Sequence, residues 1–246
     1  MHRFYVDKSQ INNNSIIIIG PDVNHIKNVL RIKTNEKITV SDGQSKEYYC
    51  IIEKMDKTEI VLKIESFDEN NTELKSQIIL FQAIPKKDKM ELIIQKAVEL
   101  GVSQIVPVVT NRVIVKIDDE KREIKKMERW QNISENAAKQ SRRGIIPIVK
   151  PIHSFNQAIE HLKDLDISLM PYENARGIDK TKEIISTIKD NSTIGIFIGS
   201  EGGFTENEIE VAKQNNIIPI SLGRRILRTE TAGLAILSML MLELDE

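Results

Sequence analysis

The chain has 246 residues, of which 40% are hydrophobic and 29% are charged; this is ordinary for a globular protein and long enough for one large or two modest domains. The formal net charge of −1 excludes a global basic field, so any nucleic-acid partner must be held by a local patch. The single cysteine, Cys50, excludes an internal disulfide and a cysteine-based zinc site, and it fits a reducing compartment.

The sequence carries no recognisable membrane or export signal. Its first five residues lack the apolar core of a signal peptide. The apolar stretch 232–244 is too short to span a bilayer and contains Glu243. The four histidines are scattered and form no metal-ligand spacing. We therefore expect a cytoplasmic protein that uses no membrane and no metal.

Residues 1–72 are predicted to form a small β-barrel domain. Apolar, strand-like runs occur at 16–19, 37–40, 47–53 and 59–64. Asp42 and Gly43, between the second and third runs, are a hairpin signal. Residues 24–31, with Ile26, Val29 and Leu30 at helical spacing, predict one short helix.

This first domain has a local excess of basic residues. Its first forty residues contain twice as many bases as acids, the bases being Arg3, Lys8, Lys27, Arg31, Lys33 and Lys37. Such an excess is found on many solvated surfaces and also on surfaces that bind nucleic acid. The pattern alone leaves both interpretations open.

The polar segment 68–72 predicts a linker, and residues 73–246 then alternate between strands and helices. Strands are predicted at 77–84, 104–109, 148–150, 166–170, 194–199 and 217–222. Helices are predicted at 86–100, 118–141, 155–162, 178–188, 206–214 and 230–244. This alternation is typical of an α/β domain with a mostly parallel sheet and helices on both faces.

The glycine-rich loop 199–203 follows a predicted strand. Its glycine spacing fits neither the dinucleotide fingerprint nor a phosphate-binding P-loop, and Ser200 lacks the flanking pattern of a nucleophile elbow. Thr205 and Glu208 form a capping box, which favours a structural role for both. Glu201 is left on the turn, where it would either bind a cationic group or be solvated.

A second glycine loop, 221–231, carries Arg224, Arg225 and Arg228. Arginines after a glycine at a strand end suit an anionic ligand. The apolar Ile226 and Leu227 predict that the loop is packed. Together the two loops indicate a pocket walled by main-chain groups, suited to a nucleoside-like ligand.

Segments 198–208 (IGSEGGFTENE) and 222–232 (LGRRILRTETA) closely resemble the two signature loops of the small-subunit (16S) ribosomal RNA uracil-N3 methyltransferase family. This family belongs to the knotted SPOUT methyltransferases. Segments 89–101 and 130–147 resemble two further motifs of the family, and segments 3–5 and 25–31 resemble its PUA-like barrel. The resemblance covers nearly the whole chain.

The resemblance implies a PUA-like β-barrel at 1–72 that binds RNA and a SPOUT methyltransferase domain at 73–246 with a C-terminal trefoil knot. It implies S-adenosylmethionine as methyl donor, a homodimer, and 16S ribosomal RNA in small ribosomal subunits as the substrate. The cofactor would contact Met170, Pro171, Ile198, Gly199, Ser200, Glu201, Gly202, Gly203, Ser221, Leu222, Gly223, Ile226 and Leu227.

The reaction implied is direct methyl transfer to N3 of uracil. Arg228 would stabilise the uracil anion or grip its phosphate, and Glu230 or Glu201 would position the nucleotide or act as base. Expected RNA contacts are Arg3, Lys27, Arg31, Arg142 and Arg143. Two alternatives stay open: a SPOUT enzyme that acts on a ribose hydroxyl or a transfer RNA base, and a non-catalytic RNA-binding assembly protein.

Two positions depart from the family's pattern. Ser200 stands where the family usually has proline, which would leave the loop less rigid. Asn35 stands where the family usually has glycine, and because asparagine tolerates positive φ, the turn is expected to survive.

Overall fold

The computed structural model describes residues 2–69, 72–113 and 120–245. Contacts divide the chain into two compact units. Unit 1 comprises Met1–Glu73 and Ala138–Ile146, and unit 2 comprises Leu74–Ala137 and Pro147–Glu246. A single boundary between 72 and 73 assumed two consecutive stretches, whereas the structure groups residues 138–146 with the first unit.

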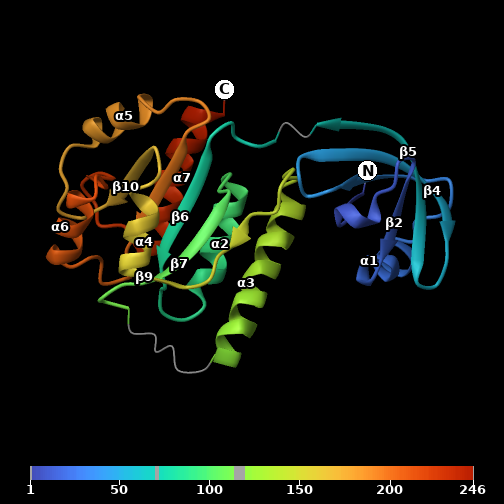
Figure 1. The fold of residues 1–246 in the computed structure, drawn as a ribbon, viewed down its shortest axis with the longest axis horizontal. Coiled ribbons are helices and arrows are strands. Elements are labelled where there is room, and N and C mark those ends of the chain that lie inside the picture. Colours follow the sequence, from blue (N-terminus) through green and yellow to red (C-terminus); the bar gives the residue numbers. More distant parts are fainter. Residues whose placement is uncertain (1, 70–71, 114–119, 246) are drawn as a thin grey trace. The chain divides into compact units, whose positions relative to one another are not determined.

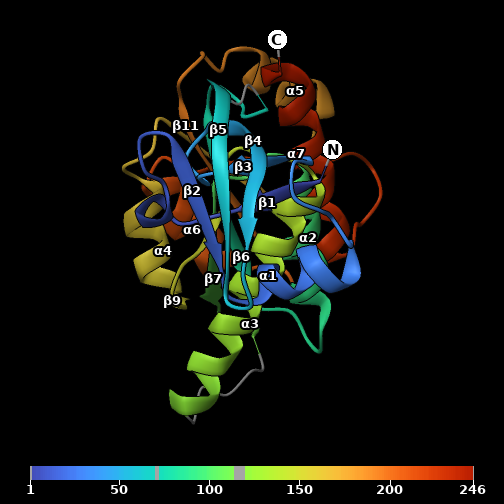
Figure 2. The ribbon, with the colours of Figure 1, turned by 90° about the vertical axis from the view of Figure 1, so that its right-hand side faces the viewer.

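Unit 1 is built on a five-stranded sheet with the order β1-β3-β4-β5-β2 (Figure 2). The strands are β1 (Arg3–Tyr5), β2 (Ser15–Ile19), β3 (Lys37–Ser41), β4 (Lys46–Met55) and β5 (Glu59–Glu69). The β3–β4 pair is antiparallel, as the Asp42–Gly43 turn predicts. Alternate residues such as Ile16, Ile18 and Ile60 are fully or almost fully buried, so one face of the sheet forms the unit's hydrophobic core.

The short helix of unit 1 differs from its prediction. It begins earlier, as α1 (Pro21–Asn24), and continues as a π-helical turn (His25–Val29). Proline suits the first helical position because its missing N–H needs no partner there. Ile26 is fully buried, but Val29 is 62% exposed, so the wider turn moves Val29 off the predicted apolar face. Asn35 adopts φ +69°, as expected.

Three short elements of the structure have no counterpart in the sequence prediction: β1, the 3-10 helix at Lys8–Gln10, and β9 (His153–Ser154). Each has only two or three residues, which is too short for a periodic pattern. The predicted linker is also partly wrong, because Asp68 and Glu69 belong to β5 and pair with β4. Residues 70 and 71 of that linker, and 118 and 119 of the predicted long helix, lie outside the described residues.

Unit 2 contains a sheet in which every strand pair is parallel (Figure 1). The strand order is β12-β10-β11-β6-β7-β8, with β9 also pairing β7. These strands are β6 (Gln77–Ala83), β7 (Gln104–Val109), β8 (Ile148–Val149), β10 (Ile167–Pro171), β11 (Thr193–Ile198) and β12 (Ile218–Ile220). The predicted parallel α/β architecture is thus confirmed.

Helices cover both faces of this sheet (Figure 1). On one face, Phe81 and Phe197 pack with residues of α4 (Phe155–Leu162) and α6 (Glu206–Gln214). Because strand side chains alternate, Gln82 and Ile198 point to the other face. There they lie beside Gly233 of α7 (Thr229–Leu244).

The remaining helices are α2 (Lys89–Glu99), α3 (Glu120–Gln140) and α5 (Ile178–Ser186). Helix α2 packs against α7. The predicted stop of α2 is confirmed by Gly101, which adopts φ +90°. Among the described residues, no helix is both long and apolar enough to cross a membrane.

Candidate active site

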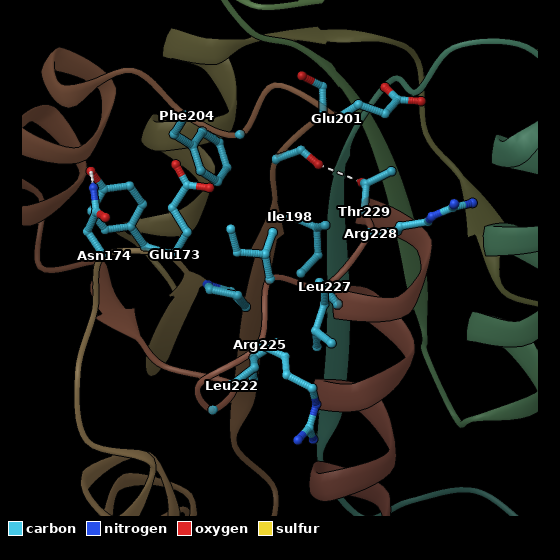
Figure 3. Close-up of a pocket in the computed structure, with 18 of the residues that line it drawn as sticks. Glu173, Asn174, Ile198, Glu201, Phe204, Leu222, Arg225, Leu227, Arg228 and Thr229 are labelled. Carbon is cyan, nitrogen blue, oxygen red and sulfur yellow. Dashed lines mark hydrogen bonds between the residues drawn. The ribbon is translucent and has the colours of Figure 1, made fainter.

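A pocket of about 670 Å³ lies at the carboxyl ends of β10 and β11 (Figure 3). Both glycine loops line it: Ile198 and Gly199 stand on one side and Leu222 and Gly223 on another. In a parallel sheet, this edge is where the loops that follow neighbouring strands meet. The predicted convergence of the two loops therefore occurs.

Main-chain geometry explains the glycines. A Cβ on Gly199 would lie 3.2 Å from the backbone of Gly203 and from the Phe204 ring, so a side chain there would force the loop apart. Gly203 and Gly223 adopt φ +67° and +110°, which side chains oppose. The Ser200 hydroxyl is buried and finds no hydrogen-bond partner in the described part of the chain.

A buried polar chain ties the first loop to the start of α7. Gln82 donates from Nε2 to the Thr229 hydroxyl over 2.9 Å. That hydroxyl donates to the Gly199 carbonyl over 2.6 Å, the bond drawn as a dashed line at Thr229 in Figure 3. Gln82 is fully buried and Thr229 is 5% exposed. These two hydrogen bonds link β6 to the first loop through Thr229, so β6 helps to set the position of the loop, while Gln82 Oε1 has no hydrogen-bond partner among the described residues.

The capping box is confirmed. The Thr205 hydroxyl accepts from Glu208 N–H, and a Glu208 carboxylate oxygen accepts from Thr205 N–H over 2.7 Å. The other oxygen of Glu208 accepts from Asn111 N–H over 2.9 Å. Phe204 and Ile209 are both buried, as a hydrophobic staple requires. With both oxygens engaged and only 1% of the residue exposed, Glu208 is structural.

The second loop is anchored at its start and open afterwards. The Thr181 hydroxyl donates to the Ser221 carbonyl over 2.9 Å. Beyond it, Ile226 is 83% exposed and Arg228 is also exposed. The prediction of a packed loop around Arg228 was wrong, because Ile226 does not enter the core of this chain. Arg228 points away from Glu173 on the far side of the pocket (Figure 3).

Lys89 joins the two acidic candidates. Its Nζ lies 3.1 Å from Glu201 Oε1 and 3.3 Å from Glu230 Oε2. The Lys86 N–H also donates to Glu201. Burial raises the pKa of Glu201, but hydrogen bonds from its own N–H, Lys89 and Lys86 outweigh burial and hold that pKa below its usual value. The Glu201 side chain is therefore a carboxylate held by Lys89 and by the Lys86 N–H.

Most of the predicted cofactor residues line the pocket, and three do not. Met170 is fully buried in the core below the sheet edge. Gly202 lies outside the lining, with its carbonyl accepting from Arg112. Ser221 is buried against Thr181. The lining residues that the prediction missed are Lys89, Tyr172, Glu173, Asn174, Arg176, Phe204, Thr229 and Ala232, while Arg224 and Arg225, expected to suit an anionic ligand, also line the pocket. The segment after β10 carries polar residues at a strand end, and that signal was overlooked.

The residues expected to contact RNA differ in exposure and in their partners. Arg143 is 4% exposed and forms a forked ion pair with Glu73, so it is a structural residue of unit 1, and its assignment as a phosphate contact was wrong. Lys27 donates to the Asp56 carbonyl over 2.8 Å, and Arg3 is paired with Glu47. Arg31 and Arg142 are exposed.

Comparison with known families agrees with this architecture. A family model described as an RNA methyltransferase domain matches residues 72–241, and one described as an RNA methyltransferase PUA domain matches residues 18–65. The chain belongs to the RNA methyltransferase family.

Within the described residues, no three His, Cys, Asp or Glu side chains are grouped so as to hold a metal ion.

Two relatives of this RNA methyltransferase are similar over nearly their whole length. The Bacillus subtilis "Ribosomal RNA small subunit methyltransferase E" is 35% identical, over 97% of this chain and 95% of the relative. The Mesomycoplasma hyopneumoniae protein of the same name is 36% identical, over 97% and 98%. The crystal structure of a Neisseria gonorrhoeae protein with this name, bound to S-adenosyl methionine, matches with a TM-score of 0.84 at 33% identity, over 96% of this chain and 95% of the other.

Proposed function

We propose that this protein transfers a methyl group from S-adenosylmethionine to N3 of a uridine in 16S ribosomal RNA, acting in the cytoplasm on small ribosomal subunits. The observation that carries the proposal is the convergence of the two signature loops on one pocket in a member of the RNA methyltransferase family. Relatives named for small-subunit ribosomal RNA and similar over the full length support the substrate.

The pocket fits the proposed cofactor. Its volume of about 670 Å³ is in the range for a nucleoside-sized ligand. Gly199 keeps the loop free of a side chain that would clash with Gly203, so main-chain N–H and C=O groups can face the ligand. Ile198, Leu222 and Leu227 supply apolar walls. When bound, S-adenosylmethionine supplies a methyl group activated by a sulfonium.

The acceptor nitrogen carries a proton near neutral pH, so the chain must hold a uracil while that proton leaves. Arg228, exposed at the rim, would stabilise the negative charge that develops on uracil. The Lys89 ammonium lies 3.3 Å from the Glu230 carboxylate. Glu201 is already engaged by Lys86 N–H and by Lys89, so we assign Glu201 to positioning. We assign Glu230 to binding the nucleotide or to accepting its proton.

The test is methyl mapping. The protein is incubated with labelled S-adenosylmethionine and small subunits that lack the modification, and the RNA is digested and analysed by mass spectrometry. We expect the label on a uridine ring nitrogen of 16S RNA. A ribose methyl or a labelled transfer RNA would overturn the proposed target, and cofactor binding without turnover would identify a non-catalytic RNA-binding protein.

A further inference from the structure

A second cavity in unit 2, of about 360 Å³, lies between the start of α2 and one side of α3. It is called the α2–α3 groove below. Its lining consists of Ile84, Pro85, Lys87, Asp88, Met90, Glu91, Arg122, Lys125, Lys126, Arg129 and Trp130. The lining thus holds five basic and two acidic residues in a chain whose formal net charge is −1. Because the chain as a whole is nearly neutral, a nucleic-acid contact needs a local concentration of basic residues, and this groove provides one.

Contacts within the groove hold two of its basic side chains in place. Trp130 is 3% exposed, and Lys126 Nζ lies 4.6 Å from the centre of its ring. Partial burial lowers the pKa of Lys126, which means that its ammonium is short of water and gains from a nearby anion. Arg129 is held by Glu91 over 2.7 Å. The cations are therefore partly positioned before any ligand arrives.

The groove shares a segment with the candidate active site. Lys87 and Asp88 line the groove, whereas Lys86 N–H and Lys89 hold Glu201 in the methyl-transfer pocket. Lys87 adopts φ +58°, an unusual conformation that turns the segment between the two sites. A polynucleotide with one base in the pocket can therefore continue into the groove.

We propose that the α2–α3 groove binds backbone phosphates of the RNA nucleotides that flank the target uridine. This inference rests on the proposed function, since it assigns a second contact surface to the same substrate. Charge complementarity and the shared segment 84–89 carry it. Sequence is read at base edges while phosphate contacts set register, so this groove contributes grip and orientation and leaves the choice of base to the pocket.

The test removes the charges of Lys87 and Lys125, two groove lysines that neither line the methyl-transfer pocket nor contact the Trp130 ring. The variant Lys87→Gln/Lys125→Gln is compared with wild type and with Lys189→Gln, an exposed lysine after α5 in the same unit. Methyl transfer to unmodified small subunits is measured against subunit concentration. We expect KM for subunits to rise on the order of ten-fold, with kcat and S-adenosylmethionine affinity unchanged.

Binding is measured separately, without turnover, as the salt dependence of affinity for a single-stranded 16S RNA fragment that contains the target. We expect the slope of log K for RNA binding against log salt, which is negative, to become shallower by roughly 0.7 for each phosphate contact removed. An unchanged KM and slope would overturn the groove assignment, and an acidic protein would then be the partner to seek. If wild type transfers no methyl, the proposed function fails, while the slope still decides the groove. Circular dichroism and the thermal midpoint verify that each variant folds.

Discussion

Arg228 is the residue on which the proposed chemistry depends most. It stands at the N-cap position of α7 without a side-chain capping hydrogen bond, lines the pocket and is exposed. Removing a group that stabilises charge in the transition state typically costs on the order of 100-fold or more in kcat. We therefore expect Arg228→Ala to reduce methyl transfer by that factor and to leave S-adenosylmethionine binding, measured by calorimetry, unchanged.

The matched variant is Arg228→Lys. It keeps the charge but loses the planar fork of donors, so activity should fall between wild type and Arg228→Ala if the arginine binds phosphate or uracil oxygens in a forked manner. Full activity in Arg228→Ala would show that another cation supplies this charge. Lys89 would then be the first to examine, because it already lies beside both carboxylates.

At the scale of one element, the start of α6 separates stability from catalysis. Thr205 and Glu208 lie next to the signature loop, yet their polar atoms are engaged in the capping box and with Asn111. Thr205→Ala should lower the free energy of unfolding by about 1 kcal/mol, measured by denaturant titration. Methyl transfer per folded molecule should stay at the wild-type level. A large loss of kcat without a loss of stability would contradict the structural assignment.

Element boundaries also mark what the sequence could predict. Helices with a capping box, such as α4 and α6, were located to the residue, because apolar spacing and caps act locally. The conformation of the second loop could not be predicted. Its apolar Ile226 suggested packing, but burial depends on which surface is nearby, and none of the residues that the structure describes covers it. In the same way, the partner of Arg143 is Glu73, a residue far away in sequence that no local pattern identifies.

For the whole molecule, the family resemblance supplied what local patterns could not. Residue patterns alone gave two glycine loops and a parallel sheet; the chemistry came from the specific pairing of those loops. The contacts of Lys89 could not be predicted from the sequence. It lies on one face of α2 by its spacing, and only the fold brings it within 3.3 Å of Glu201 in the first loop and Glu230 in the first turn of α7, both more than a hundred residues away.

We propose a homodimer that buries the exposed part of α7, a helix with apolar residues along most of its length, together with the second loop. Leu242 is 74% exposed and Ile226 is 83% exposed, so each presents apolar surface that a second copy of the chain would remove from water. A second copy of the chain would cover both residues and would supply the packing that the Arg228 loop lacks.

Sedimentation of wild type should then give twice the mass of the chain, and Leu242→Glu should shift the protein toward monomer by placing a charge in an apolar contact. Ile148→Glu is the matched control, because Ile148 is also exposed, at 51%, but lies on β8, away from α7. If the dimer orders the second loop, methyl transfer by Leu242→Glu should fall at low protein concentration and recover as concentration rises. A monomeric wild type with full activity would rule out this assembly, and Ile226 would then be a solvent-exposed residue of the second loop.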